Sequence, residues 1–201
     1  MKKLLISVVL LAAASAAHAN LVQNGSFEDT IQADGTWNVY NNISGWATVS
    51  GPGIEIRNNV AGVASHGVNF VELDSHNDKN TNSAMKQLIT TSAGSLYELL
   101  FDYSPRINQP STTNGISVFW NGYLLADVTA TGGSSNLWVV QRFFVTGTGG
   151  NDELKFLATG KDDSLGGNID NVRLNAVPVP AAAWLFASAI GLFGLARRNS
   201  I

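Results

Sequence analysis

The sequence has no cysteine and few charged residues, and each shortage excludes classes of protein. Without cysteine, the 201-residue chain cannot form a disulfide bond, a thiolate metal site or a cysteine nucleophile. The 12 Lys and Arg residues against 15 Asp and Glu give a net charge of −3, and no basic run occurs, which argues against nucleic-acid binding. Hydrophobic residues make up 45% of the chain, which argues against an intrinsically disordered protein.

Familiar catalytic motifs are also missing. The sequence contains no Gly-x-Ser-x-Gly nucleophile turn, no His-Glu-x-x-His zinc motif and no Walker loop. After residue 19 only two histidines remain, His66 and His76, and their spacing does not suit a zinc site. We therefore expect a protein that is not an enzyme.

The N-terminal residues 1–19 have the pattern of a secretory signal peptide. Two lysines precede an apolar run over residues 4–14, and Ala17 and Ala19 supply the small residues of a cleavage site before Asn20. A membrane anchor or a buried helix are the alternatives, but the apolar run is too short to span a bilayer. The pattern predicts export and cleavage by signal peptidase.

The C-terminal residues 176–201 form a second targeting segment. It opens with the four residues Val177, Pro178, Val179 and Pro180. Residues 181–196 then carry no charge, and Arg197 and Arg198 follow at once. As a helix this run would be about 24 Å long, short for a hydrocarbon core of about 30 Å. Packing on the domain is the alternative, but a helix that is apolar on all sides favours a transmembrane helix with the arginines in the cytoplasm.

This C-terminal pattern, with Trp184 in register, resembles a PEP-CTERM sorting signal, although Val179 stands where that family has glutamate between the prolines. The resemblance implies processing by a membrane exosortase in a Gram-negative bacterium that makes exopolysaccharide. The protein would be tethered transiently to the inner membrane and then released to the cell surface or the extracellular matrix.

Residues 20–175 read as a single β-domain. This segment has eight basic and fifteen acidic residues, a net charge of −7, which does not suit anionic lipid or nucleic acid. Short runs of β-branched and aromatic residues alternate with Gly, Asn, Ser and Pro, and Asn121-Gly122 is a strong hairpin signal. The pattern predicts a sandwich or barrel with strands near 21–22, 53–57, 69–74, 84–90, 96–103, 115–120, 123–128, 138–145, 152–159 and 169–174.

Several phrases of this domain, taken in order, resemble the galactose-binding-like jelly rolls. They lie at residues 21–28, 45–46, 71–75, 97–104, 118–122 and 167–174. The resemblance implies an all-β jelly-roll sandwich. It carries less weight for function, because this fold supports many functions.

The same resemblance implies a structural calcium ion where the two ends of the domain meet. Glu28 and Asp170 would be the side-chain ligands and Ser26 a carbonyl donor, a set that suits calcium because Ca²⁺ prefers six to eight oxygen atoms. The alternative is that Glu28 and Asp170 are solvated or paired with Arg173.

A second group of polar residues begins on the predicted strand 69–74, where alternation puts Glu72 and Asp74 on one face, and continues with His76 and Asp78 in the loop that follows. As a calcium loop it fails, because Lys79 stands where the turn glycine is needed. A strand running into a polar loop is the simpler interpretation. A glycan hydrolase using Glu72 or Asp74 is the alternative, and it would need two carboxylates across a cleft.

Aromatic residues are the remaining indication of function, because sugars stack on aromatic rings beside amides and carboxylates. Trp46, Trp120 and Trp138 match apolar strand positions, so we expect them in the core. Trp37 and Tyr40 lie in a polar stretch and are candidates for an exposed binding platform. Arg106 and Asn108 are candidates to line the same loop-bearing face of the domain.

The sequence therefore predicts an exported, non-catalytic surface or matrix protein that binds carbohydrate, with exopolysaccharide as a candidate ligand. Two alternatives stay open: a purely structural surface protein without a glycan ligand, and an envelope glycan hydrolase.

Overall fold

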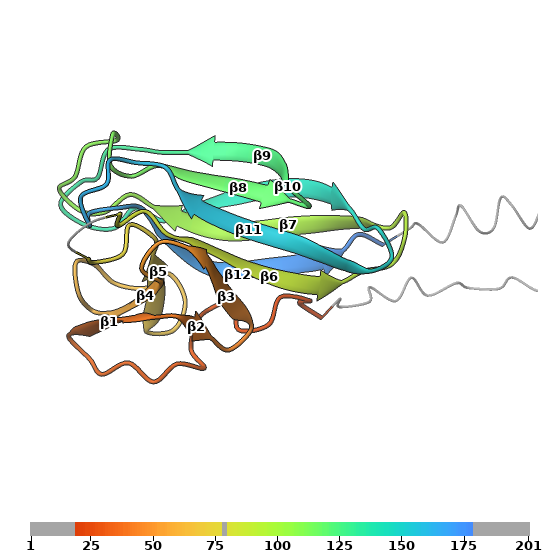
Figure 1. Cartoon of the computed structure of the whole chain (residues 1–201), viewed down its shortest axis with the longest axis horizontal. Helices are drawn as coiled ribbons and strands as arrows, with labels where there is room; N and C mark the ends of the chain where they lie inside the picture. The colour runs from red at the N-terminus through yellow and green to blue at the C-terminus, as the bar shows by residue number, and fades with distance from the viewer. Residues whose placement is uncertain (1–18, 78–79, 179–201) are drawn as a thin grey trace, which may run out of the picture. The chain divides into compact units, whose positions relative to one another are not determined.

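A computed structural model describes residues 19–77 and 80–178, and these form a sandwich of two antiparallel sheets (Figure 1). Sheet A contains, in spatial order, β1 (Thr36–Tyr40), β4 (Ile54–Asn58), β5 (Asn69–Glu72), β12 (Asn168–Ala176), β7 (Leu96–Ser104) and β10 (Val139–Thr146). Sheet B contains β2 (Asn42–Ile43), β3 (Trp46–Ser50), β6 (Ala84–Thr90), β11 (Asn151–Ala158), β8 (Ile116–Trp120) and β9 (Tyr123–Val128). Consecutive strands repeatedly cross from one sheet to the other, which confirms the predicted all-β jelly roll.

The two predicted targeting segments lie almost entirely outside the described residues. The residues outside the described ranges include the cleavage-site residue Ala17, the apolar run 181–196 and both C-terminal arginines. Among the residues that are described, no helix is long and apolar enough to cross a membrane.

Alternation along the strands places one face of each sheet in a shared core. A row of aromatic rings links the two sheets there: Trp46 of β3 lies 5.9 Å from both Phe27 and Phe156, and Phe156 of β11 lies 5.1 Å from Phe101 of β7. Trp46 and Trp120 are buried in this core, as predicted. Trp138 is not, because it is half-buried on the outer face of sheet A, where its ring packs edge-on against Phe70.

The N-terminal segment of the domain runs beside the last strand, β12. The Leu21 amide donates to the Leu174 carbonyl at 2.9 Å, and the Val172 amide donates to the Gly25 carbonyl at 2.8 Å. A Cβ atom at Gly25 would lie 2.0 Å from the Val172 carbonyl oxygen, so this close approach requires glycine. The prediction that the two ends of the domain lie side by side is thus correct, although residues 21–22 are not the predicted strand and lead into a turn at residues 23–26.

Nine of the predicted strands are present, and three observed strands were not predicted. β1, β2 and β3 lie in the stretch 36–50, where polar residues such as Asn38 and Asn42 interrupt the apolar pattern. These strands lie at one edge of each sheet, where half of the side chains face solvent. The Asn121-Gly122 hairpin joins β8 to β9 as predicted, with both residues at positive φ (50° and 79°).

The aromatic row yields a stability prediction. We expect Trp46→Ala to lower the free energy of unfolding by about 3–5 kcal/mol, because it empties a fully packed site and removes the indole donor to the Asn24 carbonyl. Urea denaturation measures the change, and Leu88→Ala on the exposed face of β6 is the control, expected within about 0.5 kcal/mol of wild type. A loss below about 1 kcal/mol for Trp46→Ala would contradict this packing.

Candidate functional site

Four charged residues form a buried network on the outer face of sheet A. Glu55 of β4 lies directly opposite Glu72 of β5, and both are fully buried. Arg57 places Nε 3.0 Å from Glu72 and Nη2 2.5 Å from Glu55, while Arg106 Nη1 lies 2.6 Å from Glu72 Oε2. Two carboxyl groups and two guanidinium groups thus meet in one buried network. Burial raises the pKa of Glu72 to about 8, although Arg57 and Arg106 oppose this shift.

Trp37 and His76 lie beside this network. Trp37 of β1 is the strand neighbour of Arg57, is 39% exposed, and its ring centroid lies 4.9 Å from that of His76. The backbone amide of His76 donates to Glu55 at 2.6 Å. The structure thus brings two predicted binding residues, Trp37 and Arg106, to the same face of sheet A. Arg106 is held by its ion pair, so Trp37 and His76 form the exposed part of this surface.

The other two predicted binding residues lie elsewhere. Tyr40 packs against the core, and its hydroxyl donates to Gln32 Oε1 at 2.9 Å, because a residue three positions after Trp37 faces the opposite side of a strand. Asn108 sits in an exposed turn at φ 56°, and its amide donates to the Gly133 carbonyl. The predicted set of four residues is therefore not one site.

The two carboxylates considered for glycan hydrolysis are inaccessible. Glu72 is held by the arginines, and Asp74 accepts hydrogen bonds from the Thr81 hydroxyl and from the Leu165 amide. Both side chains are fully buried, and burial raises the pKa of Asp74 as it does that of Glu72. Both carboxyl groups are shielded from solvent and engaged by these partners, so this arrangement does not favour a hydrolase.

The predicted calcium residues hold one loop from two sides. Glu28 Oε1 accepts the amides of Val68 and Asn69 at 2.9 and 2.8 Å. Asp170 Oδ2 accepts the amides of Ser65 and His66 at 2.8 and 2.7 Å. These carboxylate oxygens therefore accept hydrogen bonds from the backbone amides of the loop.

Little else in this region adds to a calcium donor set. The described part of the chain contains no group of three or more acidic or histidine side chains that could hold a metal ion. Ser26 is half-buried in the N-terminal turn region. Calcium binding stays a prediction.

A second acidic pair lies next to that loop. Asp170 of β12 is directly opposite Asp102 of β7, and both side chains are buried. Burial raises the pKa of Asp170 to about 7, and the charge of Asp102 adds to the shift. Arg173, at 3.8 Å from Asp102, is a distant counter-charge. Asp170 thus lies opposite the Asp102 carboxyl group and accepts backbone amides. The ion pair of Arg173 is with Asp102, and not with Asp170 as the alternative interpretation had it.

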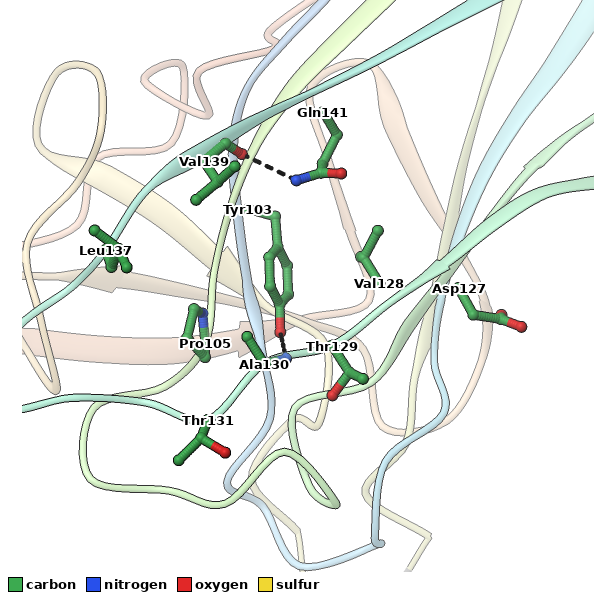
Figure 2. A pocket seen from close by; sticks show the side chains of 10 residues that line it. All are labelled: Tyr103, Pro105, Asp127, Val128, Thr129, Ala130, Thr131, Leu137, Val139 and Gln141. Carbon is green, nitrogen blue, oxygen red and sulfur yellow. Dashed lines mark hydrogen bonds between the residues drawn. The ribbon is translucent and has the colours of Figure 1, made fainter.

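An open pocket lies between the free edges of the two sheets. It has a volume of about 350 Å³ and is lined by Tyr103, Pro105, Asp127, Val128, Thr129, Ala130, Thr131, Leu137, Val139 and Gln141. Figure 2 shows the Tyr103 ring at its centre, with Leu137 and Val139 on one side and Val128 on the other. Gln141 and Thr131 lie at opposite ends, and the Asp127 side chain points away from the ring.

The Tyr103 hydroxyl at the floor of this pocket is already hydrogen-bonded, whereas the Gln141 amide at one end is more available. The Tyr103 hydroxyl donates to the Asn114 carbonyl at 2.9 Å and accepts the Ala130 amide at 3.1 Å. Burial raises the pKa of Tyr103 to about 12, so this donor stays protonated. Gln141, in contrast, makes a long 3.4 Å bond to the Val139 carbonyl, which a ligand can replace. The pocket can therefore hold a neutral molecule with apolar faces and polar edges.

The pocket residues were not predicted as a site. Strand 138–145 was predicted. A sequence alone does not show which strands lie at a sheet edge, or that β9 and β10 are edge strands on the same side of the sandwich. Asn108 lies near this place, because its loop is hydrogen-bonded to residues 132–133, and the backbone of Arg106 also approaches Gly132.

Stability should fall as pH rises from about 5 to 8. The carboxyls of Glu72 and Asp170 have raised pKa values in the folded state, so the folded chain holds protons that the unfolded chain releases in this range. Each contributes up to about 1.4 kcal/mol per pH unit. Urea unfolding at pH 5, 6, 7 and 8 should show a shallower decline for Glu72→Gln than for wild type. Equal slopes would mean that Glu72 is ionised in the folded protein.

A matched pair of variants tests the role of Glu28. Glu28→Ala should lower the free energy of unfolding by about 1 kcal/mol, because two loop amides lose their acceptor, whereas Glu28→Gln keeps an oxygen there. Melting in calcium and in chelator then tests the metal. Calcium stabilisation that is lost in both variants would confirm the predicted calcium site, and identical melting of the wild type in both buffers would reject it.

Comparison with known proteins gives the fold more clearly than the function. No family model matches the chain. The chain is 31% identical over 156 residues to the multifunctional-autoprocessing repeats-in-toxin of Vibrio vulnificus and 30% identical to that of Vibrio cholerae. The match covers 76% of this chain but only 3% of each toxin, so the shared region is a small part of those proteins.

Among solved structures, an arabinose-bound MgGH51 α-L-arabinofuranosidase matches 79% of this chain and 26% of its own with a TM-score of 0.51 at 13% identity. A CBM35 module from Paenibacillus barcinonensis matches 71% of this chain and all of its own, with a TM-score of 0.45 at 19% identity. The first of these supports the sandwich fold, and identities this low say nothing about the ligand.

Proposed function

We propose that this protein is an exported, non-catalytic carbohydrate-binding module whose ligand enters the pocket between β9 and β10. The observation that carries the proposal is the chemistry of that pocket. A sugar ring has apolar C–H faces and hydroxyl groups around its edge. Val128, Leu137 and Val139 provide apolar walls for the faces, and Gln141 and Thr131 provide polar groups at the two ends.

The targeting segments support the cellular setting of this proposal. Residues 1–19 are those of a secretory signal, and residues 176–201 resemble an exosortase sorting signal. A protein with both would pass through the inner membrane and end at the cell surface or in the matrix, where exopolysaccharide is the abundant ligand. Weak single-site binding suffices there, because many copies on one polymer add avidity.

The surface around Trp37 and His76 is the second candidate site for the same ligand class. It has an exposed indole, as glycan platforms do, but it lies on the edge strand β1 beside a buried charged network whose members contact one another. A purely structural protein without a glycan ligand is the alternative function.

A glycan pull-down with the full chain separates these possibilities. Thr131→Trp should reduce binding at least tenfold, because the large ring fills the pocket from an exposed loop position, and Gln141→Ala should weaken binding by removing the amide. Ser134→Trp, in the same loop but outside the pocket lining, is the matched control and should bind as wild type.

Trp37→Ala is the decisive comparison. If it abolishes binding while Thr131→Trp does not, the ligand sits on the Trp37 surface and the pocket proposal is wrong. If the wild type binds no neutral or acidic polysaccharide, the structural alternative replaces the carbohydrate function.

A further inference from the structure

Strand β10 is an unprotected edge of sheet A. It pairs with β7 over eight residues without a register shift, and in the described parts of the chain no strand lies on its other side. It contains neither proline nor glycine. The other edge strands are shorter or irregular: β1 has five residues, β2 has two, and β9 has a register shift against β8. β10 therefore offers a regular row of backbone donors and acceptors that faces no other described strand, while the carbonyls at its two ends, of Val139 and Thr146, accept side-chain hydrogen bonds from Gln141 and Trp120.

The side chains of β10 on the outer face do not shield this edge. Val140 is 55% exposed and Phe144 is 57% exposed. The charged residue between them, Arg142, is already paired, with Nη1 3.0 Å from Glu98 Oε1 of the neighbouring β7. Soluble proteins usually protect edges with unpaired charge, proline or a bulge. This edge has exposed apolar side chains instead, which is typical of a strand that acquires a partner.

The arrangement of these side chains is self-complementary. Val140 and Phe144 lie two residues on either side of Arg142, on the same face of the strand. A two-fold axis through Arg142 and perpendicular to the sheet would set Val140 opposite Phe144 of the second copy, and Phe144 opposite its Val140. Both exposed apolar residues would then be covered by pairs of the kind that stabilise sheets.

Charge also permits this arrangement. The two copies of Arg142 meet at the axis, but each one carries its own Glu98 carboxylate, so no uncompensated like charges come together. Asp102, the β7 neighbour of Val140, adds a further carboxylate on the same face. The centre of the contact therefore contains arginines paired with carboxylates, although the domain as a whole has a net negative charge.

We propose that two copies of this protein pair through their β10 strands, antiparallel and centred on Arg142, so that two A sheets become one continuous sheet. The pairing uses the backbone edge and the outer-face residues Val140 and Phe144. The inward-facing Val139 and Gln141 line the pocket. The contact therefore borders the pocket without using its lining side chains, and dimerisation measured without glycan can fail independently of carbohydrate binding.

The absence of cysteine allows a direct test of the register. Residues directly opposite in antiparallel strands have Cα atoms about 4.5–5.5 Å apart, within the range of about 4.4–6.8 Å that a disulfide spans. The full chain carrying Arg142→Cys should therefore form a covalent dimer under mild oxidation, seen on a non-reducing gel. Thr146→Cys is the matched control, because its two copies would lie about 27 Å apart along the strands, and it should stay monomeric.

A second variant tests the contact without a crosslink. Phe144→Lys places an unpaired charge opposite Val140 and should weaken dimerisation at least tenfold in light scattering or sedimentation, whereas Leu124→Lys on the exposed edge strand β9 should not. A monomeric wild type at all concentrations would overturn the proposal. Equal crosslinking of Arg142→Cys and Thr146→Cys, or a dimer unaffected by Phe144→Lys, would overturn it as well.

Discussion

The pairing of β12 with both β5 and β7 holds sheet A together. β12 is the last strand of the chain, yet it occupies the centre of the sheet, so neither half of the sheet is complete until residues 168–176 are in place. The same strand receives the N-terminal segment through Leu21 and Gly25. It also carries Asp170, which holds the loop at residues 65–66. Contacts this distant in sequence must overcome the entropy of loop closure, which slows folding.

Local patterns predicted the strands of the domain well where the pattern was regular. Alternation and an Asn-Gly turn suffice for β8 and β9, since period and turn chemistry are properties of neighbouring residues. They fail for β1 to β3, whose polar residues face solvent at the sheet edges. They also misplace Trp138, because an apolar residue on a strand can cover the outer face of a sheet as well as the core. Periodicity distinguishes two faces of a strand but does not say which one is inside.

The candidate site was harder to predict than the fold for a related reason. Trp37 and Arg106 were chosen for their chemistry, and they do share a face of sheet A, but the partner that fixes Arg106 is Glu72, 34 residues away. The pocket depends on which strands lie at the two free edges of the sandwich. That is a consequence of strand order, which long-range pairing decides. A side chain such as Gln141, unremarkable in sequence, becomes a candidate ligand contact only through that order.

The central place of β12 also determines how the domain bears mechanical load. The sheet continues through Ala176, and the Val177 amide still donates to the Leu96 carbonyl, so a pull on the chain beyond this point acts directly on β12. Strand β12 is bonded on both sides, to β5 and to β7. Extraction must break the long ladder to β7 together with the two residue pairs to β5 at Asn168 and Ile169, whereas an edge strand would separate from one neighbour only. A tether attached at this end would therefore hold a domain that resists tension.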